Sequence, residues 1–359
     1  MNPLLELTGL GQSIWLDNLS RTLLKEGILA TMIQHDGVSG VTSNPSILQK
    51  AISESPYYHD DLVWLKTNEI VQERRYESLV ITDIQAACDL LREVYDRTKG
   101  KDGYVSLEVS PRLAHDEVNT ISAAKRLSQA VARDNLLIKV PGTQEGVRAF
   151  EQLIAAGISV NVTLLFSLQQ VVRIFEAYMR GLKTRLANGG DTDNIKAVAS
   201  IFLSRVDTLV DKQLNKTGTA EALALRGKTA VAMSKLAYQR YKEMFHGDMF
   251  NDLAQAGCHP QYLLWASTST KNPDYKDVLY VEPLIGPETI NTLPDATLEA
   301  FRDHGIPALT VEEGVQEAED HYLRLEKMGI DMQAIGEQLQ TEGVKLFDDA
   351  FTKLLELVA

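Results

Sequence analysis

A lysine lies inside an apolar run that ends at a turn signal. The segment 136–142 reads Leu-Leu-Ile-Lys-Val-Pro-Gly and places Lys139 among large aliphatic side chains. An ordinary lysine is protonated at neutral pH and is a poor nucleophile. An apolar environment disfavours the ammonium form, so the free amine can attack a ketone and form a Schiff base. A lysine that extends from a buried strand into solvent would show the same pattern.

Polar or ionisable side chains also end the other predicted strands. They are Asp17, Asn44, Glu108, Asn161 with Thr163, Ser200 with Arg205, Ser267, and Glu282. Such groups at the ends of apolar strands are costly unless they are paired or used. Any single one could be structural: Asp17 could be a satisfied carboxylate, and Asn44 precedes a proline, which is a common turn. Their recurrence after each predicted strand favours a site built from several strand ends.

Short apolar segments alternate with amphipathic helical segments and are expected to position these side chains. The predicted strands are 13–16, 40–42, 104–109, 136–140, 159–163, 197–202, 262–266 and 278–281. The clearest predicted helices are 116–133, 144–155, 168–185 and 219–244. Eight strands separated by helices favour an α/β fold of the (β/α)8 TIM-barrel type, whose chemistry gathers at the C-terminal strand ends. The alternative is an open doubly wound sheet, but no glycine-rich phosphate loop occurs.

Helical segments exceed the needs of a plain barrel in three places. Additions are predicted near 57–98 and 206–257, and a long C-terminal helix is predicted near 331–358, outside the barrel or across its mouth. We find no Pro/Ser-rich linker and no internal repeat. The simplest prediction is one barrel domain over residues 1–359 with these helical additions.

Composition limits the partners of this chain. The net charge of −13 over 359 residues argues against general binding to nucleic acid or anionic membranes. The N-terminus lacks a basic region, and no apolar stretch reaches the roughly 20 residues of a membrane span. Cys88 and Cys258 form no ligand or disulfide pattern, and we expect buried free thiols. These features predict a cytoplasmic protein in which an anionic substrate needs a local basic site.

Five segments resemble motifs of the transaldolase family. They read WLDNLSR at 15–21, GVTSNPS at 40–46, VSLEV at 105–109, IKVPGT at 138–143 and NVTLLFS at 161–167. Each segment alone is modest evidence, but together and in this order they are specific. The resemblance runs from about residue 14 to about residue 284, and the C-terminal helices agree with it.

The resemblance implies catalytic roles for four residues. Lys139 would form a Schiff base with the C2 ketone of a ketose phosphate. Asp17 would take the proton of the C4 hydroxyl during cleavage of the C3–C4 bond. Glu108 would work with Thr163 through a water molecule and move protons while the carbinolamine forms and breaks down. The protonated iminium would serve as the electron sink, so no metal and no cofactor is implied.

The resemblance also implies substrate contacts. Asn44, Asn161 and Ser200 would hold the dihydroxyacetone fragment, and Arg205 matches the phosphate arginine of the family. The family's second basic residue is commonly an arginine after strand seven. This chain instead reads WASTSTKNP at 265–273, which resembles a subgroup and makes Ser267 and Lys271 the candidates. A lysine lacks the bidentate fork of arginine, so this departure leaves the phosphate affinity open.

The implied reaction is transfer of a dihydroxyacetone unit between sugar phosphates in the non-oxidative pentose phosphate pathway. Sedoheptulose 7-phosphate and glyceraldehyde 3-phosphate would give erythrose 4-phosphate and fructose 6-phosphate. Fructose-6-phosphate aldolases, which release free dihydroxyacetone, resemble this chain but have a glutamine at position 108 and a tyrosine at position 202. Glu108 and Phe202 therefore favour transfer, because a phenyl ring cannot protonate the enamine.

A non-catalytic barrel that binds sugar phosphates is a further alternative, and it requires an inert Lys139. The sequence leaves open the oligomeric state, monomer or homodimer, and the preference among sugar phosphates. It also leaves open any redox response of Cys88 or Cys258 and the role of Glu282. The position of Glu282 after the last predicted strand suggests only a supporting contact.

Overall fold

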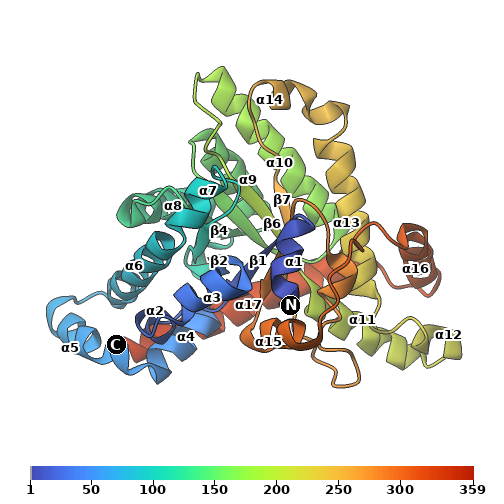
Figure 1. The fold of residues 1–359 in the computed structure, drawn as a ribbon, viewed down its shortest axis with the longest axis horizontal. Coiled ribbons are helices and arrows are strands. Elements are labelled where there is room, and N and C mark those ends of the chain that lie inside the picture. The colour runs from blue at the N-terminus through green and yellow to red at the C-terminus, as the bar shows by residue number, and fades with distance from the viewer. Residues whose placement is uncertain (1) are drawn as a thin grey trace.

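Eight parallel strands form a closed barrel in the computed structural model, which describes residues 2–359 (Figure 1). The strands are β1 (Gln12–Asp17), β2 (Val38–Thr42), β3 (Tyr104–Glu108), β4 (Leu136–Pro141), β5 (Val160–Leu165), β6 (Ala197–Phe202), β7 (Tyr262–Ala266) and β8 (Thr289–Leu293). They pair in chain order, and β8 closes the barrel on β1. All residues of β3 to β6 are buried, which explains why these strands read as apolar runs. The predicted (β/α)8 barrel is confirmed.

The predicted eighth strand over 278–281 is wrong. These residues form a turn that leads into the short 3₁₀ helix η4 (Glu282–Leu284), and the eighth strand is β8. β8 reads Thr-Ile-Asn-Thr-Leu, so its polar residues hid it from a search for apolar runs. Its Asn291 is buried because the side-chain amide donates to the Tyr280 carbonyl at 3.0 Å. The apolar residues 278–281 are half-buried or buried and pack beside the barrel without joining it.

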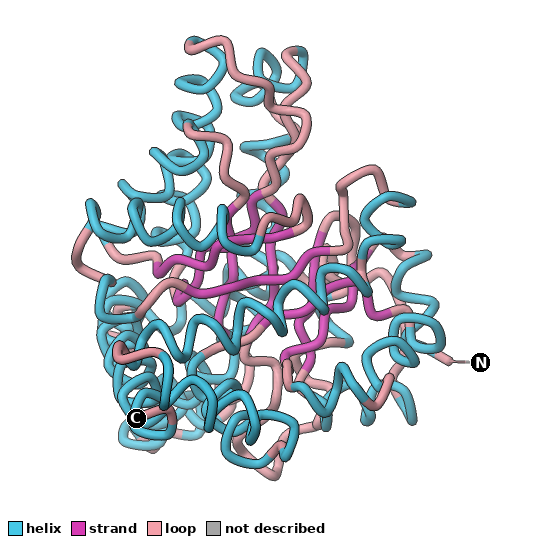
Figure 2. Tube along the Cα trace, turned by 90° about the vertical axis from the view of Figure 1, so that its left-hand side faces the viewer, coloured by secondary structure: helices cyan, strands magenta, loops and turns pink. Residues whose placement is uncertain are grey.

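Helices surround the barrel, as Figure 2 shows with the strands in magenta at the centre. They are α1 (Pro3–Gly9), α2 (Arg21–Lys25), α3 (Ile28–Asp36), α4 (Pro45–Glu54), α5 (His59–Asn68), α6 (Gln72–Leu90), α7 (Arg92–Arg97), α8 (Glu117–Val131), α9 (Gln144–Ala155), α10 (Leu168–Ala187), α11 (Leu203–Thr217), α12 (Ala220–Leu223), α13 (Thr229–Phe245), α14 (Asn251–Gln255), α15 (Asp295–His304), α16 (Val315–Lys327) and α17 (Met332–Leu357).

Three of the four clearest helix predictions are confirmed, with ends that agree within two residues. The fourth, over 219–244, is wrong as a single helix because it breaks into α12 and α13. Gly227 lies at the break with a φ of +67°, a left-handed conformation that favours glycine. Its backbone N–H donates to Asp211 Oδ1 at 3.0 Å, so α11 fixes the break.

The predicted helical additions are also confirmed. α5, α6 and α7 lie between β2 and β3, and α12, α13 and α14 lie between β6 and β7. The C-terminal helix α17 packs against α4, α11 and β5, and its ribbon passes behind α1 in Figure 1. None of the helices described over residues 2–359 is both long enough and apolar enough to span a membrane.

Candidate active site

The amine of Lys139 is buried at the centre of the predicted site. Its residue is only 4% exposed, and in the register of the sheet it lies between Glu108 on β3 and Asn161 on β5. Lys139 Nζ donates a hydrogen bond to the Ser43 carbonyl at 3.1 Å and lies 3.8 Å from Glu108 Oε2. The centroid of the Phe347 ring is 6.0 Å from Nζ. The nitrogen therefore lies close to the Glu108 carboxyl group and shares its cavity with Asp17.

Glu108 is placed to exchange protons near neutral pH. Burial raises the pKa of its carboxyl to about 7, an increase that Lys139 opposes and Asp17 reinforces. Among residues 2–359, its Oε2 atom has no hydrogen-bond partner. A carboxyl group with a pKa near the working pH can both give and take a proton, as general acid–base catalysis requires.

Thr163 lies on β5, opposite Pro141 of β4 in the sheet register. Its Oγ1 atom is buried and has no hydrogen-bond partner within residues 2–359. Both Glu108 and Thr163 thus keep a polar atom free for a bridging water molecule. The relay between them stays a prediction.

Asp17 ends β1 and is held by a threonine pair. Thr42 Oγ1 donates to Asp17 Oδ1 at 2.7 Å and lies 2.6 Å from Thr292 Oγ1. Burial raises the pKa of the Asp17 carboxyl, and the charge of Lys139 opposes that rise. Neither threonine was predicted as a site residue: Thr42 lies within the GVTSNPS segment but was given no role, and Thr292 lies on the unpredicted strand β8.

Two amide side chains have different surroundings. Asn44 caps α4, because its Oδ1 accepts hydrogen bonds from the backbone N–H groups of Ser46 and Ile47 at 3.0 and 3.1 Å. Asn44 therefore has a structural role as the cap of α4, and it also lines the site cavity. The Asn161 amide is oriented by two serines.

Asn161 is fully buried between Ser106 and Ser200. Its Nδ2 donates to Ser106 Oγ at 3.0 Å, and Ser200 Oγ donates to its Oδ1 at 2.7 Å. These two contacts fix the orientation of the Asn161 amide. Through the second contact the amide also orients the hydroxyl group of Ser200, which lines the cavity. Asn161 itself does not line the cavity.

A cavity of about 270 Å³ opens in front of Lys139 at the C-terminal strand ends. The predicted residues that line it are Asp17, Asn44, Lys139, Ser200, Phe202, Arg205 and Ser267. Side chains from five different strand ends or the segments that follow them thus meet at one place. This is the arrangement expected of a barrel active site.

Arg205 on α11 provides a partly buried positive charge at this cavity. Its guanidinium carbon lies 5.3 Å from the centroid of the Phe202 ring and 5.8 Å from that of Phe347. Burial lowers its pKa, and within residues 2–359 its Nη1 atom has no hydrogen-bond partner. A stacked guanidinium with free donors is suited to bind an anion.

Lys271 lies in the exposed loop after β7. Its Nζ donates to Ser269 Oγ at 2.6 Å, and the side chain lines a neighbouring cavity instead of the one at Lys139. Burial of its inner part and the nearby charge of Arg205 lower its pKa. Ser267, at the same strand end, lies 2.8 Å from Ser204 at the start of α11, measured between the Oγ atoms. An anion between Arg205 and Lys271 would relieve their mutual repulsion.

The long helix α17 contributes a site residue that no motif marks. Phe347 is buried and lines the cavity beside Lys139 and Arg205. α17 therefore covers part of the site, which the sequence left open.

Glu282 does not follow a strand, so its predicted position at the last strand end is wrong. It begins η4, and its Oε1 accepts a hydrogen bond from the Ile306 backbone N–H at 3.2 Å. Its carbonyl accepts a hydrogen bond from Thr310 Oγ1 at 2.5 Å. Glu282 therefore fastens the loop that follows α15. Cys88 and Cys258 are buried free thiols, as expected.

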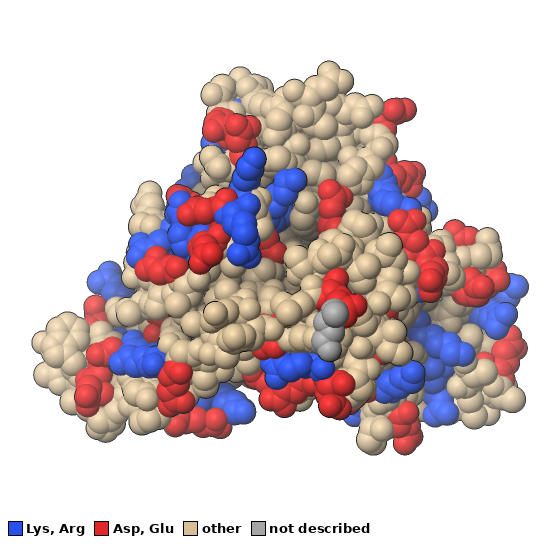
Figure 3. Space-filling view, viewed as in Figure 1, with Lys and Arg blue, Asp and Glu red and all other residues tan. Residues whose placement is uncertain are grey.

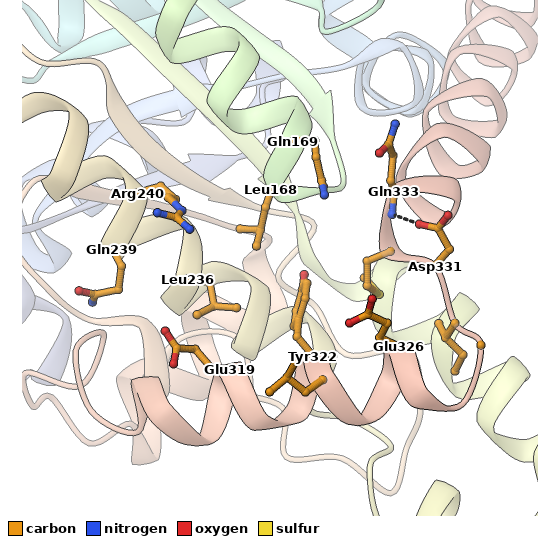
Figure 4. A pocket seen from close by; sticks show the side chains of 14 residues that line it. Leu168, Gln169, Leu236, Gln239, Arg240, Glu319, Tyr322, Glu326, Asp331 and Gln333 are labelled. Carbon is orange, nitrogen blue, oxygen red and sulfur yellow. Dashed lines mark hydrogen bonds between the residues drawn. The ribbon is translucent and has the colours of Figure 1, made fainter. Parts of the chain in front are cut away.

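A larger cavity of about 850 Å³ lies elsewhere, between α10, α13, α16 and the start of α17 (Figure 4). Leu168, Leu236 and Tyr322 face it, and carboxylates such as Glu319 and Asp331 lie at its edge. None of the predicted site residues lines it. Size alone therefore does not identify the place where the chemistry-bearing side chains meet.

A buried lysine beside a carboxyl group of raised pKa, at the strand ends of a (β/α)8 barrel, suits an enzyme that forms a Schiff base with a carbonyl substrate. The model of the Transaldolase/Fructose-6-phosphate aldolase family matches residues 14–358, and the chain belongs to this family. It is 58% identical to "Transaldolase" of Thiobacillus denitrificans and 46% identical to "Transaldolase" of Neisseria gonorrhoeae, each over 355 residues and 99% of both chains. It is 44% identical to "Transaldolase 2" of a Nostoc species over 366 residues, or 99% of this chain and 96% of the relative.

Proposed function

We propose that this chain transfers a dihydroxyacetone unit between sugar phosphates through a Schiff base on Lys139. The observation that carries the proposal is the buried Lys139 amine, 3.8 Å from Glu108 and open to a cavity with Asp17 and Arg205. The substrates are those of the transaldolase reaction, sedoheptulose 7-phosphate with glyceraldehyde 3-phosphate, and erythrose 4-phosphate with fructose 6-phosphate. The names of the similar proteins support the same reaction.

The first step joins Lys139 to the donor. Its free amine attacks the C2 carbonyl, and the carbinolamine then loses its hydroxyl as water when Glu108 supplies the proton. A pKa of about 7 lets Glu108 make that transfer and reverse it during hydrolysis. Thr163 binds the water molecule that bridges it to Glu108, since its Oγ1 has no other hydrogen-bond partner among residues 2–359.

The second step breaks the C3–C4 bond. Asp17 takes the C4 hydroxyl proton, the aldose phosphate leaves, and the bond electrons move into the iminium to form an enamine. Thr42 holds the Asp17 carboxyl in place for this transfer. Asn44 and Ser200, with Asn161 behind Ser200, bind the hydroxyl groups of the retained fragment. An acceptor aldehyde then reacts by the reverse sequence.

Arg205, Lys271 and Ser267 bind the substrate phosphate in this proposal. Arg205 and Ser267 line the cavity, and Lys271 is near enough to Arg205 for the two charges to interact. These cations form the local basic exception that an anionic substrate needs on a chain of net charge −13.

We also propose that residues 1–359 form one domain, because the buried apolar side chains make a continuous cluster around the barrel. The two free thiols agree with a reducing cytoplasm. Sugar phosphates are the proposed partners, without nucleic acid or membrane, and either a monomer or a homodimer fits.

Borohydride trapping with fructose 6-phosphate tests the Schiff base. We expect one reduced dihydroxyacetone unit on Lys139, located by intact mass and peptide mapping. Lys139→Met should abolish the adduct. Lys196→Met is a matched control, because Lys196 is equally buried at 4% but lies immediately before β6, away from the strand ends of the site. If the folded parent protein gives no adduct with fructose 6-phosphate or with sedoheptulose 7-phosphate, the proposed function is wrong. The alternative of a non-catalytic barrel that binds sugar phosphates then remains.

The acceptor dependence separates transfer from simple cleavage. With Phe202 in the cavity wall, we expect little release of dihydroxyacetone from fructose 6-phosphate until an aldose phosphate is added. Phe202→Tyr should raise the release without acceptor, since a phenol can protonate the enamine. Phe202→Leu is the control: it changes the same side chain but has no acidic proton, so release without acceptor should stay low. If the parent protein releases dihydroxyacetone continuously without an acceptor, it is instead a fructose-6-phosphate aldolase.

A further inference from the structure

A second cavity, of about 130 Å³, lies beside Glu108 and shares no lining residue with the substrate cavity; we call it the rear cavity. Glu108 lines it and at the same time approaches Lys139 to 3.8 Å. Its wall includes Tyr76 on α6, Ala123 on α8 and Phe351 on α17. The carboxyl group therefore separates two spaces, one of which holds the reacting amine.

Two buried polar atoms at this second cavity are unpartnered. Glu108 Oε2 and Ser110 Oγ each have no hydrogen-bond partner within residues 2–359. Buried polar groups in proteins are nearly always hydrogen-bonded, to water where no protein group serves. The cavity has room for several water molecules, since each needs roughly 10–15 Å³ of such volume. Water in the cavity would lie beside Ser110 and beside the carboxyl group of Glu108, whose Oε2 atom faces Lys139.

The outer rim of the cavity is charged. Arg112 is half-exposed and lies 3.8 Å from Glu73 and 3.4 Å from Asp348, measured between guanidinium nitrogen and carboxylate oxygen. Arg126 forms a second ion pair with Glu77 at 2.6 Å. The cavity thus extends from the buried carboxyl group of Glu108 to the charged side chains of Arg112 and Arg126 at the surface.

We propose that this rear cavity is the water and proton route of Glu108, and that Ser110 is a positioning residue on that route. The inference rests on the proposed function. Schiff-base formation releases one water molecule, and hydrolysis consumes one, while the sugar phosphate fills the cavity in front. Glu108 gives its proton to the departing hydroxyl, and the water formed exchanges through the rear cavity. Ser110 then passes a proton from solvent back to the carboxylate.

Filling the cavity tests the route. Ala123→Phe and Ile81→Phe place a ring in it from two helices, and Ser122→Phe on the exposed face of α8 is the matched control. We would incubate each protein with fructose 6-phosphate in H₂¹⁸O and follow the label entering the C2 carbonyl. In both filled variants we expect the rate of label exchange to fall about tenfold, with KM unchanged. This is less than the roughly 10²–10⁴-fold that general acid–base catalysis typically contributes. The control should exchange label at the parent rate.

Ser110 provides a second measurement through the pH profile. Ser110→Val removes the hydroxyl, so the ionised form of Glu108 loses solvation and the acidic limb of the kcat profile should move to higher pH. Ser110→Thr keeps the hydroxyl and should restore the parent profile. A hydroxyl with only a packing role would lower stability in Ser110→Val and leave the profile where it is.

The outcomes separate this route from the proposed function. Folded Ala123→Phe and Ile81→Phe proteins that exchange label at the parent rate would overturn the route, while borohydride adducts on Lys139 in the same proteins would leave the Schiff base standing. A parent protein that forms the adduct but incorporates no label would also overturn it. Absence of the adduct in the parent would instead remove the proposed function itself.

Discussion

Glu108 and Lys139 are the pair of residues on which the proposed chemistry depends. They are register partners on β3 and β4, and both side chains are less than a tenth exposed. Their attraction does not offset the cost of removing the carboxylate from water, because the pKa of Glu108 still rises to about 7. The site therefore holds the carboxyl group in a state that costs stability above neutral pH.

This cost predicts the pH dependence of a variant. A carboxyl whose folded pKa exceeds its unfolded value binds more protons in the folded state between the two values, so folding stability falls as pH rises from about 4.5 to about 7. Glu108→Gln removes the charge. At pH 8 it should raise the free energy of unfolding by about 3 kcal/mol relative to the parent, and near pH 4 by little.

Urea unfolding of both proteins at the two pH values measures this difference. The same variant should lower kcat by about 10²-fold or more, because it cannot move a proton. Equal stability differences at the two pH values would show that the charge of Glu108 is not the cause.

At the scale of elements, the loop after β7 and the helix α11 act as one unit. Tyr275 OH donates to Asp211 Oδ2 at 2.5 Å, and Tyr280 OH donates to Asp207 Oδ2 at 2.8 Å. Both carboxylates lie on α11, which also carries Arg205 near its start. These two contacts fasten the loop that contains Lys271 to the helix that presents Arg205.

Tyr275→Phe should loosen this attachment. The change removes one hydrogen bond to a carboxylate, which typically contributes about 1.5–3 kcal/mol, and frees the Lys271 segment to move. We expect KM for the sugar phosphate to rise about tenfold while kcat stays close to the parent value. Steady-state kinetics measures both.

Tyr57→Phe is the matched control for Tyr275→Phe. It removes a similar contact, from Tyr57 OH to Glu26 Oε1 at 3.2 Å, on the surface and away from the cavity. Equal changes in the two variants, or a loss confined to kcat, would contradict a role in phosphate binding.

At the scale of the whole molecule, the barrel and its helical additions share one buried core. Trp15 on β1 and Trp265 on β7 are fully buried, whereas Trp64 on α5 is 63% exposed. Tryptophan fluorescence therefore reports largely on the barrel, and far-ultraviolet circular dichroism on the helices.

We expect the two signals to follow one coincident transition in guanidinium chloride, as a single cooperative unit requires. Trp64→Phe is the control that removes the exposed reporter. A helical transition that clearly precedes the fluorescence transition would show that α5 to α7 or α12 to α14 unfold separately from the barrel.

The sequence by itself determined the features that depend on neighbours along the chain. The buried central strands must be apolar on both faces, so β4, β5 and β6 were predicted with small errors at their ends. Lys139, Glu108, Asp17 and Arg205 became candidates because parallel strands bring their carboxyl ends to one face, and the family resemblance implied their roles.

The tertiary structure decided what depends on contacts between distant segments. β8 is polar because Asn291 and Thr292 find partners on other elements, so no local apolar signal marks it. Phe347 joins the site only because α17 lies across the barrel, where Gln340 Nε2 donates to the Gly142 carbonyl at 2.8 Å. The rear cavity beside Glu108 likewise exists between three helices. Such features follow from how surfaces meet in space, and a pattern along one chain does not contain that information.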